Sequence, residues 1–160
     1  MRLFRGPAPL LLLRFLAALV TQMDAAKQPP AVRQRYIHFL NQHRDNSNAN
    51  TGGKYCDKLM AKRGLTRPNC KNTNSFIHAT DSAIKDVCGN KGEPYGNLRL
   101  SCDSFRVTTC KLRGGSNRQP CKYTHDNRPR HIVIACDQGY PVHYDEGKVI
   151  VNRGRKCRRR

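Results

Sequence analysis

Apolar residues in the first half of the chain recur at helical spacing. One group lies three or four residues apart and forms a single helical face: Val32, Tyr36, Phe39 and Leu40. This spacing predicts a helix from 32 to about 43. A second short helix is predicted over 54–62 and a third over 80–87, where Thr80 is a favourable N-cap residue. Residues 45–53 are rich in Asn, Ser and Gly and predict a loop.

The second half alternates short apolar runs with turn residues, which is typical of strands. The predicted strands span 71–78, 98–102, 105–113, 121–125, 130–136 and 142–145. Residues 131–135 are the best candidate for a central strand, and the Gly-, Asn- and Pro-rich stretch 88–96 predicts a loop. Helices precede strands without regular alternation between the two. The pattern therefore predicts an α+β fold with an antiparallel sheet.

The first 26 residues differ from the rest of the chain. A basic start is followed by a Leu- and Ala-rich run over 8–20, which is too short to span a membrane as a helix. This pattern predicts a secretory signal peptide over 1–26 and a secreted, extracellular protein. The remainder divides into one domain, 27–146, and a tail, 147–160. Six of the last eight residues are Lys or Arg, and such a block predicts polyanion binding.

All eight cysteines follow the predicted signal peptide. An even number of cysteines in a small secreted domain predicts a disulfide framework, which stabilises a chain with a small apolar core. A zinc site is the alternative, but the chain has no CxxC pair and its cysteines are evenly spread. We therefore predict disulfides and no metal. The pattern alone does not choose among the many possible pairings.

The chain carries a formal net charge of +19. A domain this basic is attracted to polyanions, and solubility alone requires much less charge. RNA, heparin-like glycans and anionic membranes all meet this requirement. Charge therefore identifies the class of partner and does not choose among its members.

Cleavage of RNA by its own 2′-hydroxyl needs three groups: a base for the hydroxyl proton, an acid for the leaving 5′-oxygen, and a cation beside the phosphoryl oxygens. Two histidines and a lysine can supply them at neutral pH without a metal or cofactor. The chain has six histidines, and each taken alone is more often structural than catalytic. They are His38, His43, His78, His125, His131 and His143. Their spacing does not single out a pair.

Three short blocks resemble the pancreatic ribonuclease (ribonuclease A) superfamily in order and spacing. The blocks are QHRD at 42–45, CKNTNSF at 70–76 and PVHYD at 141–145. The resemblance covers about 36–146 and implies three short helices packed on a bent antiparallel sheet. It also implies catalytic roles: His43 as general base, His143 as general acid, and Lys71 as the cation that stabilises the phosphorane.

The same resemblance implies a set of substrate-binding residues: Gln42, Asn74, Ser75, Tyr144 and Asp145. In this set Gln42 contacts the phosphate, and the backbone and side chain of Ser75 read the pyrimidine edge. Asp145 orients the acid through its second ring nitrogen. For Gln42 and Asp145, ordinary capping or surface hydrogen bonding is the alternative.

Further segments, 35–40, 62–66, 97–99 and 107–112, resemble the angiogenin branch of this superfamily. This resemblance implies three disulfides: Cys56–Cys110, Cys70–Cys121 and Cys88–Cys136. Cys102 and Cys157 are left over. They bond to each other and pin the tail, or they form intermolecular or glutathione bonds.

The angiogenin-like segments also imply partners and a location. We expect a monomer whose main partner is RNA, with actin or a ribonuclease inhibitor as further partners. The basic segment 62–65 resembles one used for nuclear or nucleolar entry, and a solvated helix end is the alternative reading.

Two residues depart from the family pattern. Ser75 replaces the Thr of the signature, which keeps the hydroxyl and loosens its fit. Glu146 stands where a side chain of the angiogenin branch can fold back over the pyrimidine pocket. We therefore expect retained pyrimidine preference and modest activity.

The sequence predicts a secreted endoribonuclease that cleaves single-stranded RNA after pyrimidines through a 2′,3′-cyclic phosphate, with angiogenesis as one biological outcome. The alternative is a cationic host-defence (antimicrobial) protein that acts on anionic membranes or glycans, with catalysis incidental. A third hypothesis is an inactive heparin-binding ligand. The complete set of His43, Lys71 and His143 argues against the third.

Overall fold

The computed structural model describes residues 29–47, 51–151 and Cys157. The predicted signal peptide and most of the basic tail lie outside these residues. The N-terminal half contains the helices α2 (Pro30–His43), α3 (Tyr55–Lys62) and α4 (Asp81–Lys85), and α4 continues as the 3-10 turn η1 (Asp86–Cys88). This confirms the three predicted helices. No helix among the described residues is long and apolar enough to cross a membrane.

Local chemistry accounts for where the helices begin. α2 starts two residues earlier than predicted, because Pro30 occupies the first turn, where the missing N–H of proline removes no helical hydrogen bond. Thr80 caps α4 as predicted, and its Oγ1 accepts a hydrogen bond from the N–H of Ala83 at 3.2 Å.

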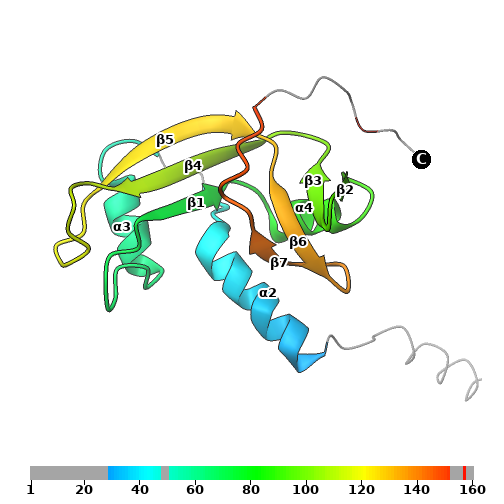
Figure 1. Ribbon diagram of the computed structural model, residues 1–160, viewed down its shortest axis with the longest axis horizontal. Coiled ribbons are helices and arrows are strands. Elements are labelled where there is room, and N and C mark those ends of the chain that lie inside the picture. Colours follow the sequence, from blue (N-terminus) through cyan, green and yellow to red (C-terminus); the bar gives the residue numbers. More distant parts are fainter. Residues whose placement is uncertain (1–28, 48–50, 152–156, 158–160) are drawn as a thin grey trace, which may run out of the picture.

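The strands form two antiparallel sheets (Figure 1). They are β1 (Thr73–Ile77), β2 (Gly92–Tyr95), β3 (Leu98–Ser101), β4 (Phe105–Leu112), β5 (Tyr123–Arg130), β6 (Val133–Asp137) and β7 (Tyr140–Tyr144). One sheet has the order β1-β4-β5 and the other has the order β2-β3-β6-β7. The predicted central strand is confirmed as β6, which lies between β3 and β7 and begins at Val133. α2 contacts both sheets, through β1 and β7.

Two strands differ from the sequence-based prediction. The predicted loop 88–96 contains β2, which pairs with β3 at the edge of its sheet, where Pro94 is tolerated. β5 runs past its predicted end at 125, through Pro129, because it pairs with β4 along its whole length. Both are edge strands whose residues suit loops and whose pairing is set by the neighbouring strand.

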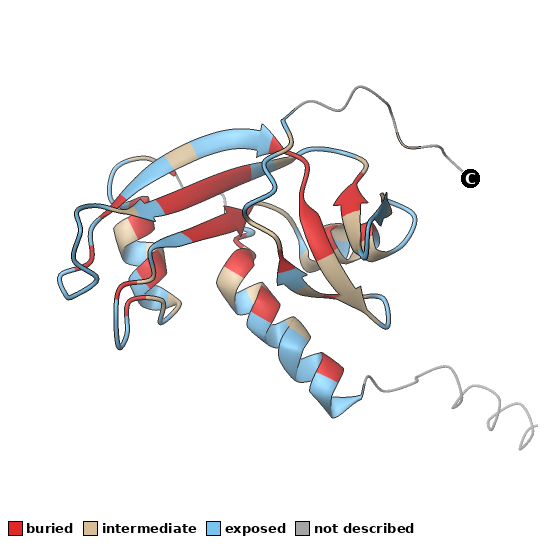
Figure 2. Cartoon of the chain, viewed as in Figure 1, coloured by how far each residue is buried: buried red, intermediate tan, exposed pale blue. Residues whose placement is uncertain are grey.

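The core consists of two clusters. The first packs α2 and α4 against strands of both sheets and contains Phe39, Ile77, Ile84, Val87, Val107, Ile132, Ile134 and Tyr144. The second packs α3 against the three-stranded sheet and contains Tyr55, Cys56, Met60, Cys70, Phe76, Cys110, Cys121 and Tyr123. Figure 2 shows the buried residues concentrated along β1, β4 and β6. The last turn of α2 and the whole of β1 after Thr73 are thus held by buried contacts.

The structure pairs all eight cysteines. The bonds are Cys56–Cys110, Cys70–Cys121, Cys88–Cys136 and Cys102–Cys157. The three pairings implied by the family resemblance are therefore present. Of the two alternatives for the remaining cysteines, the structure contains the internal bond, which attaches residue 157 beside the end of β3.

Candidate active site

His43 occupies the last position of α2, on the same helical face as Phe39. It is 4% exposed, and its ring meets that of Tyr144 edge-on with centroids 5.3 Å apart. Its Nδ1 lies 3.0 Å from the carbonyl oxygen of Ser75 in β1. A carbonyl can only accept, so Nδ1 carries the proton of the neutral ring and Nε2 is left as the basic nitrogen.

Burial lowers the pKa of His43 from 6.5 to about 4. The hydrogen bond to Ser75 opposes this shift, while the nearby charges of Lys71, His143 and His38 add to it. His43 is therefore neutral, and able to accept a proton, throughout the physiological pH range.

Asn74 connects the predicted base to the predicted cation. Its side chain is completely buried at 0% exposure. Its Nδ2 donates to the carbonyl of Gln42 at 2.8 Å, and its Oδ1 accepts from Nζ of Lys71 at 2.7 Å. Both ends of the amide are occupied, so Asn74 holds Lys71 next to the end of α2.

The third predicted catalytic residue, His143, comes from β7, where it lies opposite Ala135 of β6. It is exposed, whereas the next residue, Tyr144, is buried, as expected of alternating strand positions. Its effect on the pKa of His43 places it within electrostatic reach of that ring. The backbone N–H of Asp145 donates to Val133, and among the described residues no hydrogen bond joins its carboxylate to His143. The orienting role of Asp145 stays a prediction.

Glu146 turns back from the end of β7 toward the other half of the site. Its Oε1 lies 3.6 Å from Nζ of Lys71 and 4.0 Å from Nδ1 of His43. Burial raises the pKa of this carboxyl, while Lys71 and the hydroxyl and amide of Ser75 act to lower it. The carboxyl group thus occupies space beside Lys71, the predicted cation, and near Ser75, the predicted base-reading residue.

Two residues that sequence analysis did not identify, Thr109 and Arg130, are connected to the site through hydrogen bonds that lead to Ser75. Thr109 lies opposite Ser75 in the β1–β4 ladder, and their hydroxyl oxygens are 2.9 Å apart. Arg130 is 7% exposed and donates from Nη1 to Oγ1 of Thr109 at 3.0 Å. Strand alternation could have shown that Thr109 faces one side of β4, but only the pairing register brings it to Ser75.

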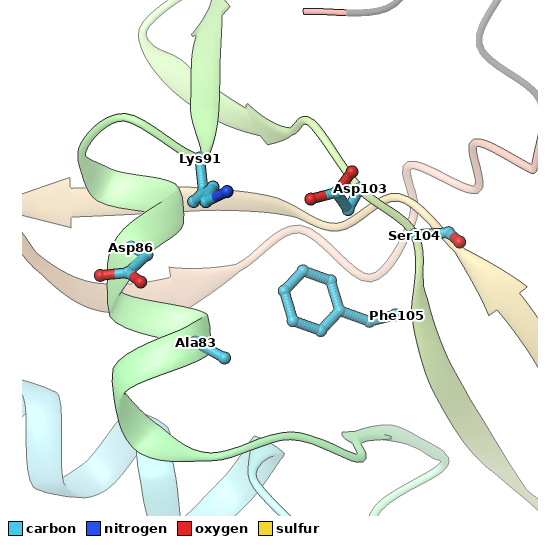
Figure 3. A pocket seen from close by; sticks show the side chains of 6 residues that line it. All are labelled: Ala83, Asp86, Lys91, Asp103, Ser104 and Phe105. Carbon is cyan, nitrogen blue, oxygen red and sulfur yellow. The ribbon is translucent and has the colours of Figure 1, made fainter.

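Two cavities in the described part of the chain lie away from these residues. One, of about 200 Å³, lies between α4 and the start of β4. Figure 3 shows the side chains that line it: Ala83, Asp86, Lys91, Asp103, Ser104 and Phe105. A second, of about 370 Å³, follows α3 past Lys54, Lys58 and Lys62. Neither contains a predicted site residue. No group of three or more His, Cys, Asp or Glu residues in the described ranges is placed to hold a metal ion.

Comparison with known proteins agrees with the geometry. The pancreatic ribonuclease family matches residues 34–145. Angiogenin of the pig, Sus scrofa, is 46% identical over 146 residues, which cover 91% of this chain and 96% of the pig protein. Angiogenin of the rabbit, Oryctolagus cuniculus, is 47% identical over 146 residues, covering 88% of this chain and 93% of the rabbit protein.

Solved structures give the same result. Green turtle egg-white ribonuclease superposes with a TM-score of 0.68 at 47% identity, covering 72% of this chain and 98% of the turtle protein. A zebrafish ribonuclease superposes with a TM-score of 0.69 at 44% identity, covering 76% of this chain and 100% of its own. The shared fold, the family match and the identity to angiogenins together show that the chain belongs to the pancreatic ribonuclease family.

Proposed function

We propose that this protein is a secreted endoribonuclease that cleaves single-stranded RNA after pyrimidines. The observation that carries the proposal is the environment of His43. A buried, neutral imidazole has its Nδ1 fixed by Ser75 and lies within electrostatic reach of Lys71 and His143. Membership of the pancreatic ribonuclease family supports the same activity.

In the first step, Nε2 of His43 takes the 2′-hydroxyl proton and the 2′-oxygen attacks phosphorus. The bond to the 5′-oxygen breaks, and His143 gives its proton to that oxygen. Lys71 offsets the negative charge that grows on the phosphoryl oxygens. The products are a 2′,3′-cyclic phosphate and a 5′-hydroxyl. In hydrolysis of the cyclic phosphate the two histidines exchange roles.

The remaining predicted residues divide into two kinds. We assign Ser75 to the pyrimidine edge and Gln42 to the phosphate. Tyr144 encloses one side of the general base, because its buried ring packs edge-on against the ring of His43. Asn74 is fully buried with both amide ends bonded, so we assign it to positioning Lys71 rather than to contact with RNA.

The activity is modest, because Glu146 competes with the substrate. Its carboxylate lies 3.6 Å from Nζ of Lys71, where the phosphate of RNA needs a cation. Like charges repel, so RNA binding requires Glu146 to move or to be protonated.

The disulfide framework supports an extracellular location, because such bonds persist in oxidising compartments. The host-defence alternative gains no support from the comparisons with known proteins, whose names are those of angiogenins and ribonucleases.

The test is cleavage of cytidylyl-adenosine by the wild type, by His43→Ala and by a matched control, His125→Ala, which removes an exposed histidine of β5. We expect His43→Ala to lower kcat/KM by about a thousandfold, and His125→Ala to leave it unchanged. Phosphorus NMR identifies the 2′,3′-cyclic phosphate. Thermal unfolding of each variant verifies the fold. A folded His43→Ala protein that keeps cleavage within about tenfold of the wild type contradicts the proposal.

A further inference from the structure

Polar side chains form one row across the three-stranded sheet, beginning at the base-reading position. Ser75 of β1 lies opposite Thr109 of β4, and Thr109 lies opposite Asp126 of β5. Arg130, at the end of β5, turns back onto this row. Its Nη1 lies 3.0 Å from Oγ1 of Thr109, and its Nη2 lies 2.7 Å from Oδ2 of Asp126.

The guanidinium gives this row a direction. It has five N–H donors and no acceptor, so Oγ1 of Thr109 must accept from Arg130. Thr109 is 4% exposed, and among the described residues its hydroxyl has one other partner, the hydroxyl of Ser75 at 2.9 Å. A buried hydroxyl proton without an acceptor is unfavourable. Thr109 therefore donates to Ser75, and Ser75 keeps its own proton for a further acceptor.

The free protein offers Ser75 such an acceptor. Burial raises the pKa of the nearby Glu146 carboxyl, while the hydroxyl and the amide of Ser75 act to lower it, as groups close to that carboxyl do. An ionised carboxylate can only accept hydrogen bonds. Ser75 thus presents its proton on the side of the site from which the base enters.

Cytosine and uracil differ at the ring edge that this proton meets. N3 of cytosine is an acceptor, while N3 of uracil carries a hydrogen and donates. With cytosine, every hydroxyl proton in the chain from Arg130 to the base has an acceptor. With uracil, the chain contains one donor too many, and one buried proton is left unpaired.

We propose that Arg130 is a specificity-positioning residue, which fixes the direction of the hydrogen bonds through Thr109 and Ser75 so that the site favours cytosine over uracil. This inference rests on the proposed function, because it takes Ser75 as the residue that reads the base. Asp126 sharpens it. If the guanidinium is removed, the carboxylate opposite Thr109 becomes an acceptor at the end of the row, the direction reverses, and Ser75 can accept from N3 of uracil.

The experiment compares kcat/KM for cytidylyl-adenosine and uridylyl-adenosine. The variant is Arg130→Met, and the matched control is Arg128→Met, which removes the other guanidinium bound to Asp126 without touching Thr109. We expect the wild type to favour cytidine and Arg130→Met to lower the cytidine-to-uridine ratio by at least about fivefold, the worth of one hydrogen bond. Arg128→Met should leave the ratio unchanged.

A second variant covers the case in which Arg130→Met does not fold. Thr109→Val keeps the shape and removes the relaying hydroxyl, and it should lower the ratio to a similar extent. A wild type that prefers uridine overturns the inference, as does an unchanged ratio in a folded variant. Absence of cleavage above the His43→Ala background overturns the proposed function together with the inference. If cleavage depends on His43 but the cytidine-to-uridine ratio is the same in the folded variants as in the wild type, only the inference about Arg130 is overturned.

Discussion

The two histidines of the candidate site come from opposite ends of the chain and occupy different environments. His43 is buried at the end of α2, bonded to the backbone of β1 and packed against Tyr144. His143 is exposed on β7, and Asp145 and Glu146 follow it where the strand ends. We call the surroundings of His43 the buried half of the site, and the end of β7 with Glu146 the exposed half. Burial sets the proton affinity of His43. On the proposed function, the exposed half controls access to His43, because Glu146 extends from there to Lys71.

The largest expected difference between the roles of His43 and His143 appears when the leaving group of the substrate is changed. We expect His43→Ala and His143→Ala each to slow cleavage of cytidylyl-adenosine by about a thousandfold. On cytidine 3′-(4-nitrophenyl phosphate), nitrophenolate leaves without protonation. His143→Ala should then lose less than about tenfold, while His43→Ala should lose as much as before. Steady-state kcat/KM gives both numbers. Equal losses on the two substrates would remove the distinction between base and acid.

The second effect concerns pH and the buried half. Burial lowers the pKa of His43 to about 4, so the folded protein binds fewer protons there than the unfolded chain, which titrates near 6.5. Above pH 6.5 the ring is neutral in both the folded and the unfolded protein, so it does not lower the free energy of unfolding there. Between 6.5 and 4 the free energy of unfolding should fall by about 1.4 kcal/mol per pH unit on account of this ring.

NMR titration of the His43 ring tests this directly. In the folded protein its midpoint should lie near 4, and in denaturant the same ring should titrate near 6.5. The acid limb of kcat/KM should follow the folded value. A midpoint near 6.5 in the folded protein would show that the ring is accessible to water and that the two halves do not differ in this respect.

The smallest effect belongs to Glu146. Glu146→Gln keeps the size of the side chain and removes the charge beside Lys71, so kcat/KM for dinucleotides should rise by about fivefold. The control is Asp103→Asn, which removes one negative charge at the cavity of Figure 3, away from the site. An equal rise in both variants would assign the gain to net charge. No rise in Glu146→Gln would show that the carboxylate does not hinder the substrate.

The sequence points to the candidate catalytic residues only through the family motifs. Burial does not separate His43 from His131, which is 9% exposed and also bonded to a carbonyl, that of Ser101. His78, bonded to Thr108, is likewise enclosed. A local pattern cannot distinguish a buried structural histidine from a buried catalytic one, because the difference lies in what surrounds the free nitrogen.

Pairing between strands explains the two strands and the side-chain contacts that the sequence could not predict. β2 and β5 contain proline and polar residues that suit loops, and they become strands because a neighbour supplies hydrogen bonds. Ser75 and Thr109 are 34 positions apart, and Arg130 lies 21 positions beyond Thr109. Their contact depends on the register of two ladders, which no local spacing contains. The helices, whose periodicity is local, were predicted to within a few residues.

The completely buried amide of Asn74 limits which side chains evolution can place there. It must donate to Gln42 and accept from Lys71 with two atoms of one planar group. Asp has the size but no N–H, and Leu has the shape but neither function. Gln has both functions, but its extra methylene does not fit a closed space. Substitution at this one position therefore disturbs both the end of the helix that carries His43 and the neighbouring Lys71.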